Sequence, residues 1–173
     1  RSRSMPSELL QADPLCNCLT SRQLGEQIAA GIEDADVELF VRLRPLLPES
    51  PHGFVIGNAF GYSSIILGLL LAKQGGSVDV LDAESEGDCN SLGSRLTRTI
   101  AETAHLNLQL TIGVSPQDLQ AAMRSQIYDL AFIDGEHTHQ QLLKDFHAME
   151  PHLAQRAIVA LHDVAHSGLW AGK

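Results

Sequence analysis

The chain has 173 residues, 44% of them hydrophobic, which suits one globular domain with a sizeable core. Its formal net charge of −9 argues against a nucleic-acid partner, because such proteins present a basic face. The longest apolar stretch, residues 65–72, is too short to span a bilayer, so we expect no membrane partner.

The cysteines and the first residues indicate the cellular compartment. The chain has three cysteines, Cys16, Cys18 and Cys89. An odd number cannot form a full set of disulfides, and their spacing is not that of a structural zinc site, so we expect free thiols and a cytoplasmic protein. Residues 1–4 lack the apolar core of a signal peptide, and we interpret them as a tag remnant before Met5.

The N-terminal third divides into two predicted parts. Residues 1–19 contain Pro6 and Pro14 and are expected to be irregular. Within residues 20–50 the hydrophobic spacing predicts two helices, the second from about Asp34. These helices would form either a lid over a site or the contact of a homodimer, and the pattern does not decide between the two.

Strand-like and helix-like segments alternate in the third predicted part, the cofactor-binding domain of residues 51–173. The alternation predicts a doubly wound, mainly parallel Rossmann-like α/β sheet with helices on both faces. Only nine residues follow the fifth strand, so we expect the last strands of such a sheet to be missing. The expected strands are mostly continuously apolar, as in buried parallel sheets, and comprise residues 53–57, 77–81, 108–113, 128–134 and 157–164.

Two of the intervening helices have specific start signals. Ser115, Pro116 and Asp118 match an N-cap, a proline at the first helical position and an acid in the first turn. Thr138 and Gln141 match a capping box. The helix after this box is expected to turn three apolar side chains inward, Leu142, Leu143 and Phe146.

A glycine-bounded turn is the most informative motif. An apolar strand-like segment leads through Gly57 and Gly61 into an apolar helix, and Asp82 ends the next strand-like segment. Backbone N–H groups at a helix start, beside a carboxylate at a strand end, suit a nucleoside-bearing cofactor. The dinucleotide fingerprint Gly-x-Gly-x-x-Gly is absent, because Ala59 and Tyr62 occupy its second and third glycine positions.

The motifs together point to a family. Ile-Gly-x-x-x-Gly-Tyr-Ser at residues 56–63, Asp82 after the second strand, Phe-Ile-Asp-Gly-Glu-His at residues 132–137, and the pair His162-Asp163 stand in order along the chain. In this combination the chain resembles class I S-adenosylmethionine-dependent methyltransferases, most closely their small-molecule O-methyltransferase-like branch.

The resemblance covers roughly residues 50–166 and implies S-adenosylmethionine as the cofactor. It places the methionine part over the glycine turn, the ribose hydroxyls on Asp82 with Glu84 in reserve, and adenine beside the turn around Ser115. The residues that it implies for cofactor binding are Gly57, Asn58, Gly61, Ser63, Asp82, Glu84, Ser115 and Asp134.

The residues expected to carry out the reaction follow the fourth and fifth strands. We expect Asp134, His137 and His162 to be catalytic. In one version Asp134 and Asp163 share a Mg²⁺ ion that lowers the pKa of a substrate hydroxyl. In the metal-free version His137 or His162 is the general base.

The sequence therefore predicts methyl transfer from S-adenosylmethionine to a small-molecule acceptor, at oxygen. An NAD(P)-dependent oxidoreductase is the first alternative, although the failed glycine fingerprint counts against it. A catalytically inactive cofactor-binding or structural domain is the second. It is motivated by Val55, where the family often has an acid, by Ala59, which replaces the family's middle glycine, and by the short C-terminus.

Overall fold

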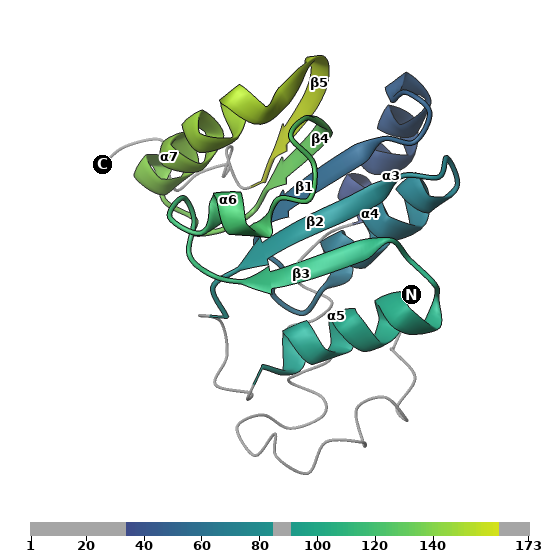
Figure 1. Ribbon diagram of the computed structural model, residues 1–173, viewed down its shortest axis with the longest axis horizontal. Helices are drawn as coiled ribbons and strands as arrows, with labels where there is room; N and C mark the ends of the chain where they lie inside the picture. The colour runs from purple at the N-terminus through teal and green to yellow at the C-terminus, as the bar shows by residue number, and fades with distance from the viewer. Residues whose placement is uncertain (1–33, 85–90, 163–173) are drawn as a thin grey trace.

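One parallel sheet forms the centre of the protein. The computed structural model describes residues 34–84 and 91–162 (Figure 1). In these ranges five strands form a sheet of order β3-β2-β1-β4-β5, in which every neighbouring pair is parallel. The strands are β1 (His52–Ile56), β2 (Ser77–Asp82), β3 (Leu108–Ile112), β4 (Tyr128–Ile133) and β5 (Leu153–Leu161). The predicted doubly wound parallel sheet is confirmed.

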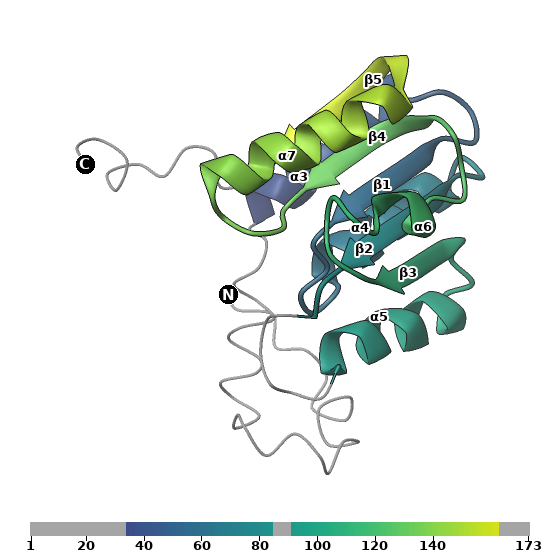
Figure 2. The same ribbon diagram turned by 60° about the vertical axis from the view of Figure 1, so that its left-hand side comes forward.

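Helices cover both faces of this sheet (Figures 1 and 2). One face carries α3 (Asp34–Leu43), α4 (Tyr62–Ala72) and α5 (Leu92–Thr103), and the other carries α6 (Leu119–Ala122) and α7 (His139–Met149). Two short 3₁₀ helices, η1 (Arg44–Leu46) and η2 (Glu150–His152), precede β1 and β5. Helix α3 begins at Asp34, where the pattern predicted a helix.

Side-chain alternation along β1 shows why its sequence is continuously apolar. Val55 packs into the core under α3 and α4, whereas Phe54 and Ile56 pack into the core under α6 and α7. None of the three is more than 3% exposed. A strand buried on both faces has no position for a polar side chain, which is the pattern expected of a central parallel strand.

Strand β5 begins earlier than predicted. The sequence indicated residues 157–164, but the strand starts at Leu153, which pairs with Tyr128. Gln155 and Arg156 are exposed at this outer strand, so its first half lacks the apolar signal of a buried strand. The register also shifts just after Tyr128, which marks an irregularity in the ladder.

The helix predicted to open at Ser115 begins later, so that prediction was wrong. Helix α6 starts at Leu119 with Asp118 as its N-cap residue. The Asp118 carboxylate accepts a hydrogen bond from the backbone N–H of Val114 at 2.8 Å and closes a turn before the helix. The Ser115 hydroxyl instead donates to Asp145 and does not cap α6.

The start of α7 is as predicted. The Thr138 hydroxyl accepts a hydrogen bond from the backbone N–H of Gln141 at 3.2 Å. The Gln141 side chain does not return this bond, because it donates elsewhere, to Ser115 and Asp145. Leu143 is 42% exposed, so its predicted inward orientation was wrong. The apolar residues that α7 packs against the sheet are Leu142, Phe146, Ala148 and Met149.

Some predictions concern residues outside the described ranges. They are the irregular segment 1–19 with its tag remnant, the free cysteines, the helix before α3, the metal ligand Asp163 and the expected lack of further strands after β5. The predicted homodimer and cytoplasmic location stay predictions. Among the described residues, no helix is long and apolar enough to cross a membrane.

Candidate cofactor and active site

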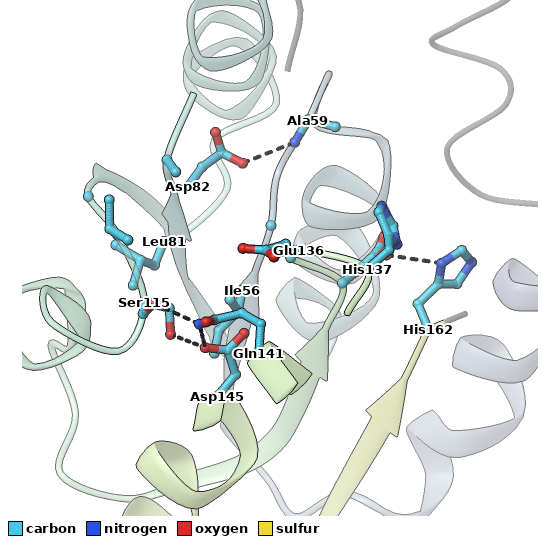
Figure 3. Close-up of a pocket in the computed structure, with 16 residues that line it drawn as sticks. Ile56, Ala59, Leu81, Asp82, Ser115, Glu136, His137, Gln141, Asp145 and His162 are labelled. Atoms are coloured by element: carbon cyan, nitrogen blue, oxygen red, sulfur yellow. Dashed lines mark hydrogen bonds and ion pairs between the residues drawn. The ribbon is translucent and has the colours of Figure 1, made fainter. Parts of the chain in front are cut away.

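A cavity of about 600 Å³ lies where the strands end at their carboxyl side (Figure 3). Each of the five strands contributes its last residues or the loop that follows. This is the edge at which open α/β sheets bind ligands, at the point where the strand order reverses between β1 and β4. The lining residues at the strand ends are Ile56, Gly57, Ala59, Leu81, Asp82, Ala83, Gly113, Val114, Ser115, Asp134, Gly135, Glu136, His137 and His162, and α7 adds Gln141 and Asp145.

Close packing on both sides fixes the glycine turn. Gly57 has φ +93°, and a Cβ there would lie 2.0 Å from the backbone oxygen of Asp134. Gly61 has φ +89°, and a Cβ there would lie 1.9 Å from the Thr97 hydroxyl of α5. Only glycine tolerates both the left-handed backbone and these approaches. The turn is therefore held between the end of β4 and α5.

Asp82 lies at the cavity wall and also closes the glycine turn. Its Oδ2 accepts hydrogen bonds from the backbone N–H groups of Asn58 at 2.6 Å and Ala59 at 3.2 Å. Its Oδ1 accepts one from the backbone of Glu84 at 2.7 Å. A carboxylate has about four acceptor positions, so these described donors leave one, on Oδ1. Asp82 can thus accept one further hydroxyl without losing a bond to the turn.

Four other predicted cofactor residues lie behind the wall rather than in it. Asn58 is 2% exposed and donates to the Thr97 hydroxyl at 3.0 Å. Glu84 accepts hydrogen bonds from Ser94 and, at 2.8 Å, from Ser91, which tie the end of β2 to the start of α5. The remaining two, Gly61 and Ser63, are buried and do not line the cavity.

Departures from the family motif affect the cavity differently. Val55 is fully buried in the core under α4 and does not line the cavity, so its side chain removes nothing from the wall. Ala59 does line it and has φ +43°, a left-handed conformation in which glycine would be less strained.

Asp134 and His162 meet at the opposite side of the cavity. Asp134 follows β4, His162 follows β5, and His162 Nδ1 lies 3.0 Å from Asp134 Oδ1. His162 Nε2 lies 3.6 Å from Oδ2 of Asp36 on α3. The imidazole thus lies between two carboxylates, and His137 lines the same cavity. The sequence had given no role to Asp36, because its approach depends on how α3 packs against the end of β5.

The sequence also did not predict the polar network that Asp145 forms with Ser115 and Gln141 at another corner of the cavity. Asp145 is 1% exposed, and its Oδ1 accepts hydrogen bonds from the Ser115 hydroxyl at 2.6 Å and from Gln141 Nε2 at 2.8 Å. Gln141 Nε2 also donates to the Ser115 backbone oxygen at 2.8 Å. Burial raises the pKa of the Asp145 carboxyl, and the two donors oppose that rise. The available signal was weak: Gln141 and Asp145 share one face of α7 beside its apolar residues.

The comparison with known proteins identifies the family. A sequence model of the family described as a methyltransferase domain matches residues 54–164. The chain belongs to this methyltransferase family. The matched residues include the glycine turn, Asp82, Asp134 and His162. The sequence motifs had predicted that the chain is a methyltransferase of this kind.

Solved structures of methyltransferases share the fold. The O-methyltransferase from Bacillus cereus in complex with SAH is 20% identical with a TM-score of 0.60, over 86% of this chain and 60% of that one. A putative caffeoyl-CoA O-methyltransferase from Staphylococcus aureus is 18% identical with a TM-score of 0.64, over 82% of this chain and 63% of that one. The O-methyltransferase TomG from Streptomyces achromogenes, in complex with SAM, is 18% identical with a TM-score of 0.61, over 75% of this chain and 56% of that one.

These likenesses show the fold of this methyltransferase chain. The chain spans about 60% of the length of those structures. No curated protein matches its sequence. Among residues 34–84 and 91–162, no group of three or more His, Cys, Asp or Glu side chains could hold a metal ion. Asp163, the second predicted metal ligand, is outside these ranges.

Proposed function

We propose that the chain transfers a methyl group from S-adenosylmethionine to the oxygen of a small-molecule acceptor. One observation carries the proposal: a single cavity is lined both by the expected cofactor residues Gly57 and Asp82 and by the pair Asp134 and His162. Its volume of about 600 Å³ lies within the usual range for small-molecule sites.

The lining of the cavity fits this cofactor. The remaining acceptor position on Asp82 Oδ1 suits a ribose hydroxyl. Leu81 and Val114 supply apolar surface near the Ser115 corner, as a purine ring requires. When bound, S-adenosylmethionine supplies a methyl group on a positively charged sulfur. The chain's own residues then have to position the acceptor and remove its proton.

His162 is the proposed general base. The Asp134 carboxylate oxygen lies 3.0 Å from Nδ1, and its negative charge favours the proton on that nitrogen and leaves Nε2 to accept the acceptor's proton. A base oriented by a third group is the usual arrangement for activating a nucleophile. Asp36, near Nε2, then stabilises the imidazolium. This use of Asp134 favours the metal-free version over the Mg²⁺ version.

The test is a calorimetric titration of the protein with S-adenosylhomocysteine, with and without Mg²⁺, and with NAD in parallel. We expect micromolar binding of S-adenosylhomocysteine, weaker binding of NAD and no effect of Mg²⁺. Binding of NAD in preference would support the oxidoreductase alternative. No binding at millimolar S-adenosylhomocysteine would contradict the proposal.

Turnover needs a second measurement. Transfer of labelled methyl groups from S-adenosylmethionine to a panel of phenols, catechols and hydroxy acids should label at least one acceptor. Full cofactor binding without transfer to any acceptor of the panel would support the inactive-domain alternative. A rate that rises with Mg²⁺ would support the version that uses Asp134 and Asp163.

A further inference from the structure

The Ser115 corner of the cavity presents a carboxylate oxygen. Both hydrogen bonds that described residues make to Asp145 go to Oδ1. Oδ2 lies beside Gly135, where an added Cβ would be 3.6 Å away. Both Asp145 and Gly135 line the cavity. Because residue 135 has no side chain, none from that position covers Oδ2 on the cavity side.

The corner lies apart from Asp82 and from the two histidines of the cavity, whereas Glu136 is near enough for its charge to raise the pKa of Asp145. In Figure 3, Ser115, Gln141 and Asp145 gather on one side, Asp82 lies at a second corner, and His137 and His162 lie at a third. If Asp82 takes the ribose and His162 the acceptor, the base of the nucleoside lies at the Asp145 corner. The chemistry of that corner then decides which base fits.

We propose that Asp145 selects a 6-aminopurine, its Oδ2 accepting a hydrogen bond from the exocyclic amine of adenine. This inference rests on the proposed function, because it assumes that the cavity holds an adenosyl cofactor. A carboxylate only accepts hydrogen bonds, and the 6-amino group donates them. Hypoxanthine has a carbonyl oxygen at that position, so two acceptors would face each other. An unpaired buried acceptor is unfavourable, which makes the contact selective.

The Ser115 and Gln141 donors allow a reversal of this selectivity. In Asp145→Asn the amide oxygen stays at the Oδ1 position, because Ser115 and Gln141 both donate there. The amide NH₂ then occupies the Oδ2 position and becomes a donor toward the cavity. It would face the amino group of adenine unfavourably and the 6-oxo group of hypoxanthine favourably.

The experiment compares calorimetric affinities for S-adenosylhomocysteine and S-inosylhomocysteine at pH 8. The native protein should prefer the adenine compound by about ten- to a hundredfold, the effect of one hydrogen bond to a charged group. Asp145→Asn should lower this ratio to one or below. The matched control is Asp118→Asn, since Asp118 lies in the β3–α6 connection, accepts a hydrogen bond from the Val114 backbone N–H and does not line the cavity. It should keep the native ratio.

The outcomes separate a selective role from a structural one. A merely structural Asp145 would change stability and both affinities together, with the ratio unchanged, and that result would overturn the inference. Equal native affinity for the two compounds would overturn it even if Asp145→Asn does not fold. Failure of S-adenosylhomocysteine to bind at all would instead contradict the proposed function.

Discussion

His162 and Asp134 lie 3.0 Å apart, Nδ1 to Oδ1, although they follow different strands, β5 and β4. Parallel pairing of Ile133 with Leu161 brings the two ends to the same level of the sheet. Phe132 of β4 packs edge-on against the imidazole, with ring centroids 6.0 Å apart. The strand pairing and this aromatic contact therefore position the proposed base before any acceptor binds.

We expect His162→Ala to lower kcat for methyl transfer by about a hundred- to ten-thousandfold, the usual contribution of a general base. The affinity for S-adenosylhomocysteine should stay within about twofold, because His162 is not an expected cofactor residue and the expected ribose and adenine contacts, Asp82 and Ser115, lie at other corners of the cavity. Calorimetry and a labelled-methyl assay check the two parts. His137→Ala is the matched control, and a larger loss of kcat in that variant would transfer the base role to His137.

We expect Asp82→Ala to weaken S-adenosylhomocysteine binding by about tenfold or more, because it removes a charged acceptor. It also frees the backbone N–H groups of Asn58 and Ala59, so the glycine turn should loosen. Asp129→Ala is the control, since Asp129 binds the His52 backbone at the start of β1 and does not line the cavity. An unchanged affinity of Asp82→Ala for S-adenosylhomocysteine would contradict the proposal that Asp82 binds the ribose.

Gly57→Ala tests how tightly the turn is fixed. The added Cβ would lie 2.0 Å from the Asp134 backbone oxygen, in a left-handed conformation. The backbone alone should lower the free energy of unfolding by roughly 1–3 kcal/mol, and the steric clash adds to that. Gly68→Ala on α4 should lower stability much less, because the added Cβ would meet only leucine side-chain atoms, the nearest at 3.1 Å, and no backbone atom. Urea unfolding compares the two, and equal midpoints would contradict the packing described for the turn.

Local patterns predicted part of the site. The glycine turn and Asp82 were found because a strand, a turn and the next strand end are close in sequence and have a distinctive residue spacing. Asp134 and His162 were found for the same reason, each at the end of an apolar strand. The parallel sheet followed from the alternation of such segments.

Residues whose role depends on tertiary packing could not be found this way. Asp36 reaches His162 only because α3 packs beside the end of β5. In the sequence Asp145 is an ordinary polar residue of a helix, and its role depends on the β3–α6 connection, which brings Ser115 into hydrogen-bond contact with it. The start of β5 was missed because Gln155 and Arg156 are exposed at the sheet edge.

The raised pKa of Asp145 predicts a pH dependence of stability. Burial favours the neutral carboxyl in the folded state and raises its pKa above the ordinary value of 3.8. Between these two values the folded state binds more protons than the unfolded state, so stability falls as pH rises through that window. Above the window the loss is constant. Asp145→Asn cannot ionise and should lack this component.

Urea unfolding of the native protein and of Asp145→Asn, from about pH 3.5 to pH 7, measures the component as the difference between the two curves. The native protein should lose stability relative to the variant as pH rises above 3.8. Ser115→Ala removes a donor that lowers the pKa, so its window should extend to higher pH. Parallel curves for the native protein and Asp145→Asn would mean that burial does not govern this carboxyl, and the electrostatic account of the corner would then be wrong.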